Sequence, residues 1–187
     1  PAEPAVSTLT GVQLPADLIY LDGNSLGPPS ARTRQRLLQA LEGEWASDLV
    51  AAWNKHGWID MPARLGARIA PLVGAEPDEV IVTDSVSVNL FKLAAAALRA
   101  RPDRRTLVYE AGDFPTDGYV LQGLADLLPG VELRPAARAE LTDAVGVDTA
   151  ALLVSHVHYR SGELHDLAAL TAAAQAKGAL VIADLSH

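Results

Sequence analysis

The sequence predicts an α/β fold built on a mostly parallel sheet. From about residue 80, short apolar stretches alternate with stretches of helical periodicity, which is the order that consecutive βαβ units give. The last apolar stretch, 178–183, ends at Asp184, and open α/β sheets place charged groups in a ligand crevice in this way. Of the 187 residues, 49% are hydrophobic and 20% are charged, so the chain can bury a substantial core.

The first domain, 1–60, is predicted to be an N-terminal arm followed by a helical segment. Residues 1–19 are weakly patterned and lead into a short apolar stretch at 18–21. The turn at 22–29 holds two glycines and two prolines, which should prevent a regular element there. Ser30 is placed to cap a helix, whose apolar residues recur at helical spacing: Leu38, Leu41, Trp45 and Leu49.

The second domain, 61–187, is predicted to be the first part of a large α/β domain. Its first helix begins at Pro62 and ends at Gly74, and it should bury four apolar side chains: Leu65, Ile69, Leu72 and Val73. The elements expected after it are strand 80–83, helix 87–100, strand 106–109, helix 116–127, strand 131–133, strand 151–154, helix 164–177 and strand 178–183.

Charge and composition narrow the class of partner. There are 15 Lys and Arg residues against 23 Asp and Glu, a net charge of −8, which argues against a nucleic-acid or anionic-membrane surface and favours a small-molecule partner. The chain has no cysteine, so it offers neither a disulfide nor a thiolate ligand. With no basic, apolar leader and no apolar run near 18 residues, the expected location is the cytoplasm.

Several polar and aromatic residues follow the predicted strands. A helix beginning near Ser85 and Ser87 could bind a phosphate with its free N–H groups, although capping alone also explains both serines. The sequence there lacks the glycines of a nucleotide-binding loop. Phe114 follows the strand 106–109 and could stack on a heteroaromatic cofactor or serve as a hydrophobic staple of the next helix.

The two last strands deliver Ser155 and Asp184. Ser155 either faces the same crevice as Asp184 or is a solvated strand end. Asp184 either is solvated and caps the next turn or meets a cation, because a buried carboxylate needs a partner. In enzymes that use pyridoxal 5'-phosphate (PLP), an Asp so placed pairs with the pyridinium nitrogen. His156 and His158 share a face, but a metal site needs a third ligand that the sequence does not offer, so no metal is expected.

Taken together, five segments of the chain resemble kynureninase, a PLP-dependent family of the fold-type I aminotransferase superfamily. They are 20–27 (YLDGNSLG), 84–90, 114–117 (FPTD), 155–162 and 184–187 (DLSH). The resemblance implies the PLP-dependent transferase fold, whose large domain is a three-layer αβα sandwich with a mostly parallel sheet. It also implies that the chain is truncated before the Schiff-base lysine, since its own lysines, Lys55, Lys92 and Lys177, are not well placed.

By this resemblance, nine residues form the site for PLP. Val86 and Ser87 hold the phosphate, Phe114 stacks on the ring, and Pro115, Thr116 and Asp117 complete that wall. Ser155 lies near the cofactor, Asp184 pairs with the pyridine nitrogen, and His187 lines the site. Asn24, Ser25 and His56 approach the aromatic end of the substrate.

The implied activity is hydrolytic cleavage of the Cβ–Cγ bond of L-kynurenine or 3-hydroxykynurenine. The products are anthranilate or 3-hydroxyanthranilate and L-alanine, in tryptophan catabolism and NAD biosynthesis. The family also implies a homodimer with its site at the subunit interface. Two alternatives stay open: another fold-type I enzyme, such as a cysteine desulfurase or an aminotransferase, which would not share GNSLG or FPTD, and a non-catalytic fragment that acts only as a binding module.

Overall fold

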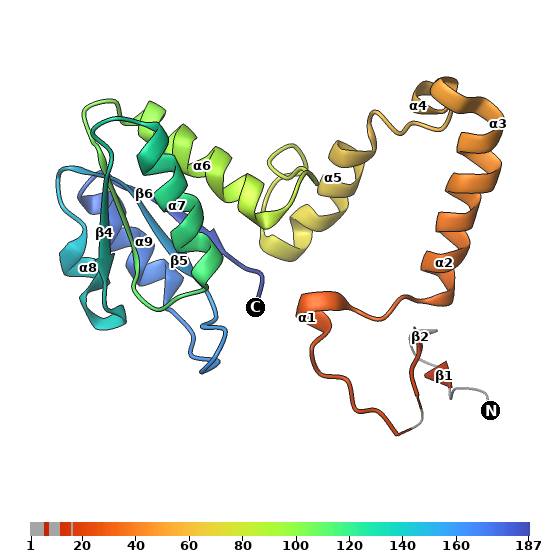
Figure 1. The fold of residues 1–187 in the computed structure, drawn as a ribbon, viewed down its shortest axis with the longest axis horizontal. Coiled ribbons are helices and arrows are strands. Elements are labelled where there is room, and N and C mark those ends of the chain that lie inside the picture. The colour runs from red at the N-terminus through yellow and green to blue at the C-terminus, as the bar shows by residue number, and fades with distance from the viewer. Residues whose placement is uncertain (1–5, 8–11, 16) are drawn as a thin grey trace. The chain divides into compact units, whose positions relative to one another are not determined.

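The computed structural model describes residues 6–7, 12–15 and 17–187, which form two compact units that divide between Thr83 and Asp84 (Figure 1). Much of the predicted N-terminal arm, residues 1–5, 8–11 and 16, lies outside the described residues. The domain boundary near residue 60 stays a prediction about the folded protein.

The first unit consists of short elements. Strands β1 (Val6–Ser7) and β2 (Val12–Gln13) pair antiparallel. The helices are α1 (Gly23–Leu26), α2 (Ala31–Leu38), α3 (Ala46–Asp48), α4 (Ala52–Lys55) and α5 (Met61–Val73), with a π-helical segment η1 (Gln39–Trp45) and a 3-10 turn η2 (Leu49–Ala51) between them. As predicted, Ser30 caps α2, because its Oγ accepts a hydrogen bond from Thr33 N at 3.1 Å.

Two expectations for this unit are wrong in detail. The turn at 22–29 does contain a regular element: the Asp22 carbonyl accepts hydrogen bonds from Ser25 N and Leu26 N, which closes the single turn α1 before the prolines stop it. The helix that begins after Ser30 is not continuous to Leu49 either. It passes through η1 and ends with α3, and Leu49 has a φ of 47°, which a non-glycine residue rarely adopts.

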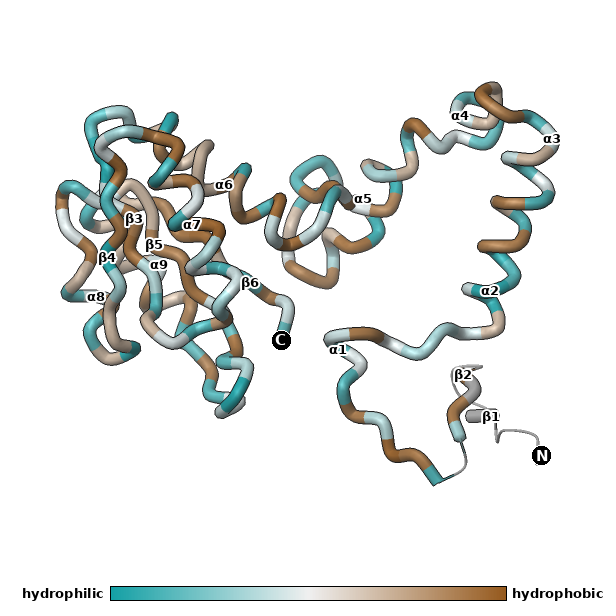
Figure 2. The backbone as a smooth tube through the Cα atoms, viewed as in Figure 1, coloured by the Kyte–Doolittle hydropathy of each residue, from teal (hydrophilic) through white to brown (hydrophobic). Residues whose placement is uncertain are grey.

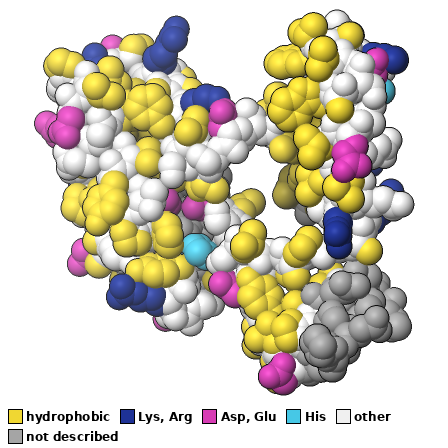
Figure 3. Space-filling view, turned by 45° about the vertical axis from the view of Figure 1, so that its right-hand side comes forward, with side chains coloured by type: hydrophobic (Ala, Val, Ile, Leu, Met, Phe, Trp, Pro, Cys, Tyr) yellow, Lys and Arg dark blue, Asp and Glu magenta, His cyan; other side chains and the backbone are white. Residues whose placement is uncertain are grey.

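Helix α5 does not bury the apolar side chains that its periodicity predicted. Leu72 is 83% exposed, and Leu65, Ile69 and Val73 are also exposed. The buried positions are Gly66 and Ala70, and a Cβ built at Gly66 would lie 1.9 Å from the Val80 carbonyl oxygen. The helix therefore packs through its small residues against the segment that follows it. Figure 3 shows that hydrophobic side chains are widespread on the surface in that view.

The predicted strand 80–83 is not formed. Val82 N donates to the Pro62 carbonyl at 3.2 Å, and the segment joins no sheet within the described part of the chain. A strand exists only through pairing with a neighbour, so apolar, extended sequence alone was not enough to specify one here.

The second unit is built on a four-stranded parallel sheet of order β4-β3-β5-β6. Its strands are β3 (Thr106–Glu110), β4 (Glu132–Ala136), β5 (Thr149–Ser155) and β6 (Leu180–Asp184). Its helices are α6 (Val86–Ala100), α7 (Pro115–Leu127), α8 (Leu141–Ala144) and α9 (Leu167–Ala176), with a 3-10 turn η3 (Arg138–Glu140) before α8. The predicted α/β fold with a parallel sheet is confirmed.

Helices cover both faces of this sheet, with α6 and α7 on one face and α8 and α9 on the other (Figure 1). Alternate residues of one strand enter opposite cores: Leu107 packs with α6 and α7, whereas Val108 packs with α8 and α9. Strand β5 is buried along its whole length, and it lies among the brown, hydrophobic segments of Figure 2. These three layers are the αβα sandwich that was expected.

Helices that could cross a membrane are not found among the residues that the structure describes, since none is both long and apolar enough.

Candidate functional site

The carboxyl ends of the parallel strands bring the predicted site residues of the second unit to one edge. Ser155 and Asp184 are partners in the register of β5 and β6, so the last residues of both strands lie side by side. Helix α6 runs in the opposite direction to β6, because Arg101 at its C-terminus donates to the Gly178 carbonyl at the start of that strand. Its 15 residues span about 22 Å, so its N-terminus, with Val86 and Ser87, points toward the same edge.

Asp113 links two of the loops at this edge. Its Oδ2 accepts a hydrogen bond from Ser155 N at 2.8 Å, and its Oδ1 accepts one from Phe114 N at 2.8 Å. The side chain is buried. One carboxylate therefore fixes the start of α7, where Phe114 and Pro115 lie, against the end of β5.

Asp117 is a buried acid with an unsatisfied oxygen. Its residue is 2% exposed, and among the described residues Oδ2 has no hydrogen-bond partner. Burial, together with the neighbouring charges of Asp184 and Asp113, raises the pKa of Asp117 to about 7. This edge is therefore rich in negative charge and holds a carboxyl group that is partly protonated at neutral pH.

Asp184 and Ser155 each keep one polar atom available. Asp184 Oδ1 accepts from Ser186 N at 2.8 Å and from Ser186 Oγ at 2.5 Å, which leaves Oδ2 for another partner. Ser155 is 1% exposed, and its Oγ has no hydrogen-bond partner in the described part of the chain. A buried hydroxyl without a partner is costly, so both atoms suit a polar ligand that would enter here.

Phe114 lies in a cluster of rings at the same edge. Tyr159 meets it at 5.3 Å between ring centroids in an edge-to-face arrangement, and His187 lies 5.4 Å from it. Phe114 is 36% exposed, so part of its ring is free to contact a ligand. This contact with His187 also places the end of the chain beside the wall formed by 114–117.

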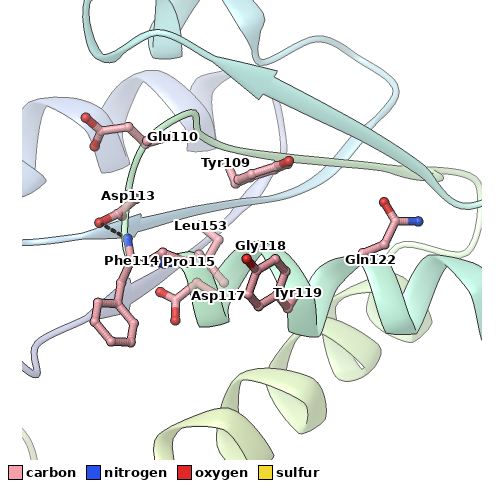
Figure 4. Close-up of a pocket in the computed structure, with 11 residues that line it drawn as sticks. Tyr109, Glu110, Asp113, Phe114, Pro115, Asp117, Gly118, Tyr119, Gln122 and Leu153 are labelled. Carbon is pink, nitrogen blue, oxygen red and sulfur yellow. Dashed lines mark hydrogen bonds between the residues drawn. The ribbon is translucent and has the colours of Figure 1, made fainter.

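A pocket of about 470 Å³ opens beside this wall (Figure 4). Its lining residues come from β3, the loop after it, α7 and β5: Tyr109, Glu110, Gly112, Asp113, Phe114, Pro115, Asp117, Gly118, Tyr119, Gln122 and Leu153. Because Ser155, Asp184 and His187 do not line it, the pocket borders the edge described above and shares only one wall with it.

The predicted substrate residues belong to the first unit. Asn24 and Ser25 lie in α1 and are exposed. His56 follows α4, and its Nε2 lies 2.7 Å from Asp48 Oδ2. The structure therefore describes Asn24 and Ser25 in one element and His56 after another, and their part in a substrate site stays a prediction.

The three lysines have partners of their own. Lys55 pairs with Asp48, Lys92 pairs with Asp84, and the Lys177 ammonium donates to the Thr142 and Val145 carbonyls. No group of side chains suited to a metal ion occurs in the ranges that the structure describes.

Sequence reasoning did not assign Asp113 and Tyr159 to this edge, and it considered His158 only as a metal ligand. Asp113 could have been found, because an Asp after a strand and directly before a helix commonly accepts hydrogen bonds from nearby backbone N–H groups. The contacts that bring His158 and Tyr159 to this edge gave no such local signal, since they are made with Gly112 and Phe114, about 45 positions away.

Comparisons with known proteins were made at the level of families, sequences and solved structures. The chain matches no protein-family model. It is 47% identical over 180 residues to a kynureninase of Burkholderia mallei and 46% identical to one of Pseudomonas fluorescens; each alignment covers 93% of this chain. The chain spans only about 43% of the length of these curated relatives.

Solved structures of low sequence identity share the fold. A C-DES mutant with glycine covalently linked to its PLP cofactor superimposes with a TM-score of 0.72 at 18% identity, covering 92% of this chain and 48% of that one. A NIFS-like protein gives a TM-score of 0.70 at 13% identity, covering 89% of this chain and 48% of that one. Sequence and fold point the same way: the chain is similar to the kynureninase family over nearly its whole length, and it shares the fold of the solved structures above.

Proposed function

We propose that this chain is the N-terminal part of a kynureninase, which hydrolyses the Cβ–Cγ bond of L-kynurenine or 3-hydroxykynurenine. The products would be anthranilate or 3-hydroxyanthranilate and L-alanine. The observation that carries the proposal is the meeting of Phe114, Asp117, Ser155 and Asp184 at one edge of the sheet, in a chain 47% identical to a kynureninase.

The residues at this edge fit PLP. Asp184 Oδ2 and the buried Ser155 Oγ are available polar atoms, Phe114 offers a partly exposed ring face, and the N-terminus of α6 offers N–H groups that favour a phosphate. Ser85 Oγ accepts a hydrogen bond from Val88 N at 3.5 Å and so caps the helix. The Ser87 hydroxyl is not needed for capping and can bind a ligand. When bound, PLP supplies the electron sink for bond cleavage next to the substrate's α-carbon.

Each residue then has a defined task. Asp184 holds a proton on the ring nitrogen, Phe114 fixes the plane of the ring with Pro115 and Thr116 beside it, and Val86 and Ser87 bind the phosphate. Ser155, Asp117 and His187 line the site. Asn24, Ser25 and His56 contact the aromatic end of the substrate, and the Schiff-base lysine comes from the part of the family's length that this chain does not span. A homodimer and a cytoplasmic location complete the proposal.

A two-stage experiment tests this function. PLP is first added to the chain itself, and induced circular dichroism in the cofactor band is expected, because a ring held in one orientation becomes optically active. Residues 1–187 are then joined to the remaining part of the Burkholderia mallei kynureninase, and anthranilate fluorescence is followed with L-kynurenine. We expect release that depends on PLP and is lost in the Asp184→Ala variant.

The alternatives give different results. A chimera that binds PLP and forms alanine from cysteine, but releases no anthranilate, would show a desulfurase-type activity instead. A chain that gives no induced signal with PLP would contradict the cofactor site.

A further inference from the structure

The loop between β5 and α9, residues 156–164, folds back on itself and is here named the clasp loop. Val157 and Leu164 form an antiparallel bridge, His158 N donates to the Glu163 carbonyl at 2.9 Å, and Gly162 N donates to the His158 carbonyl at 2.8 Å. These contacts leave residues 159–161 at the tip of a closed loop.

The His158 side chain ties this tip to the loop that leads to Phe114. Ser161 N and Arg160 N lie 3.2 and 3.4 Å from Nδ1, so Nδ1 accepts. The Gly112 carbonyl oxygen lies 3.2 Å from Nε2, and a carbonyl can only accept, so Nε2 carries the proton. In this neutral tautomer of His158, Nδ1 accepts hydrogen bonds from the clasp loop and Nε2 donates one to the Gly112 carbonyl.

Tyr159 extends the same connection to the ring of Phe114. The two rings meet edge to face, with centroids 5.3 Å apart and planes at 86°, which is a favoured geometry for aromatic pairs. The backbone N–H of Phe114 is held separately by Asp113. Phe114 is therefore held at its backbone by Asp113, while its ring contacts Tyr159 and His187.

The far end of the clasp loop is fastened to β3. His165 Nε2 lies 2.6 Å from Glu110 Oε2, both residues are buried, and Arg138 Nη1 lies 3.5 Å from Glu110 Oε1. His165 N also donates to the His156 carbonyl at 2.9 Å. This end of the loop is therefore anchored independently of the His158 side chain, whose ring joins the tip to residue 112.

We propose that His158 and Tyr159 are positioning residues that hold the Phe114 ring in the orientation needed to stack on PLP. Neither residue needs to touch the cofactor: His158 acts through Gly112 and the clasp loop, and Tyr159 acts through the edge of the Phe114 ring. This inference rests on the proposed function, because it takes Phe114 to be the stacking residue.

Hydrogen exchange in the chain without PLP tests the connection by itself. His158→Ala should raise exchange both in the clasp loop and in residues 111–114, by roughly tenfold, the weight of one hydrogen bond. Glu163→Gln is the matched control, since Glu163 reaches the His158 ring only through Ser161 Oγ, which lies 3.1 Å from Nδ1, and does not reach Gly112; a Gln can still accept from Ser161 Oγ. If exchange at 111–114 does not change in His158→Ala, the connection through His158 is wrong.

PLP binding tests the consequence. Tyr159→Leu and His158→Ala should each weaken PLP binding roughly tenfold and reduce the induced circular dichroism per bound PLP, whereas Tyr159→Phe, which keeps the ring, should restore both. His158→Gln keeps a donor for Gly112 and should lie nearer the parent than His158→Asn.

The two proposals fail in different ways. If the parent chain gives no induced circular dichroism with PLP, the proposed function is contradicted. The hydrogen-exchange comparison of His158→Ala still tests the connection between His158 and residues 111–114. A parent that binds PLP, with variants that exchange faster but keep its affinity and induced signal, would overturn the positioning role.

Discussion

Replacing Asp117 with Asn should stabilise the second unit near neutral pH. Asp117 has its pKa raised from 3.8 to about 7 in the folded chain. The folded state therefore binds more protons than the unfolded state between about pH 4 and 7. Stability falls as pH rises wherever the folded state binds more protons, so the free energy of unfolding should decrease across this range and level off above it.

The magnitude follows from the size of the shift. About three pKa units at 1.36 kcal/mol each give an upper limit of about 4 kcal/mol of lost stability at pH 7. An Asn amide would still have to be desolvated at this buried position, where Oδ2 has no hydrogen-bond partner among the described residues. We therefore expect Asp117→Asn to raise the free energy of unfolding by about 1–3 kcal/mol at pH 7 and by much less at pH 4.

Urea unfolding followed by far-UV circular dichroism between pH 4 and 8 measures this effect. All three tryptophans, Trp45, Trp53 and Trp58, precede residue 84, so tryptophan fluorescence reports on the first unit and serves as an internal reference. Asp126→Asn, at an exposed position of the same helix α7, is the matched control. A gain from Asp117→Asn that is equal at pH 4 and pH 7 would refute the reasoning.

Three further substitutions test the packing and the proposed site. Gly66→Ala should destabilise the first unit by about 1–3 kcal/mol or more, because its Cβ would meet the Val80 carbonyl. Gly43→Ala is the control and should not destabilise it, since a Cβ at Gly43 would lie 3.9 Å from its nearest neighbour. Tryptophan fluorescence during urea unfolding compares the two variants. Arg104→Ala should cost the second unit about 2–3 kcal/mol by circular dichroism, since its guanidinium donates to two backbone carbonyls. Asp184→Asn should weaken PLP binding and bleach the induced signal while the far-UV spectrum stays parental, and unchanged binding would remove its proposed role.

The sequence was sufficient to predict the parallel sheet and the edge at which its strands end. Alternation of apolar and helical stretches predicts parallel strands, and parallel strands place their last residues on one edge. A crevice shared by Ser155 and Asp184 was therefore one of the two positions predicted for Ser155. The same logic could not place His158, because its role depends on a carbonyl that the fold brings to it from residue 112.

The sequence predictions that are wrong lie mainly in the first unit, and there is a physical reason for this. Helical periodicity shows that α5 has an apolar face but not what covers it, and Leu72 is exposed where no layer lies over it among the described residues. The segment 80–83 failed in the same way, since an apolar stretch needs a neighbour with free hydrogen-bonding groups to become a strand. Local pattern therefore predicted the Ser30 cap, whose partner Thr33 is three residues away, but it could not show whether a partner covers α5 or pairs with 80–83.

The acidic edge itself supports a cationic ring as its ligand. The charges of Asp184 and Asp113 help to raise the pKa of Asp117, and the ion pairs found among the described residues include none of the three. Asp113 is satisfied by two backbone N–H groups, so the excess charge falls on Asp117 and Asp184. Asp117 can take up a proton, as its raised pKa indicates, but Asp184 holds its two hydrogen bonds through one oxygen and presents the other. The edge thus offers a free carboxylate oxygen of Asp184 and a partly exposed ring of Phe114. The protonated pyridine ring of the proposed PLP fits both, because its nitrogen gives Asp184 a cation and its face can stack on the Phe114 ring.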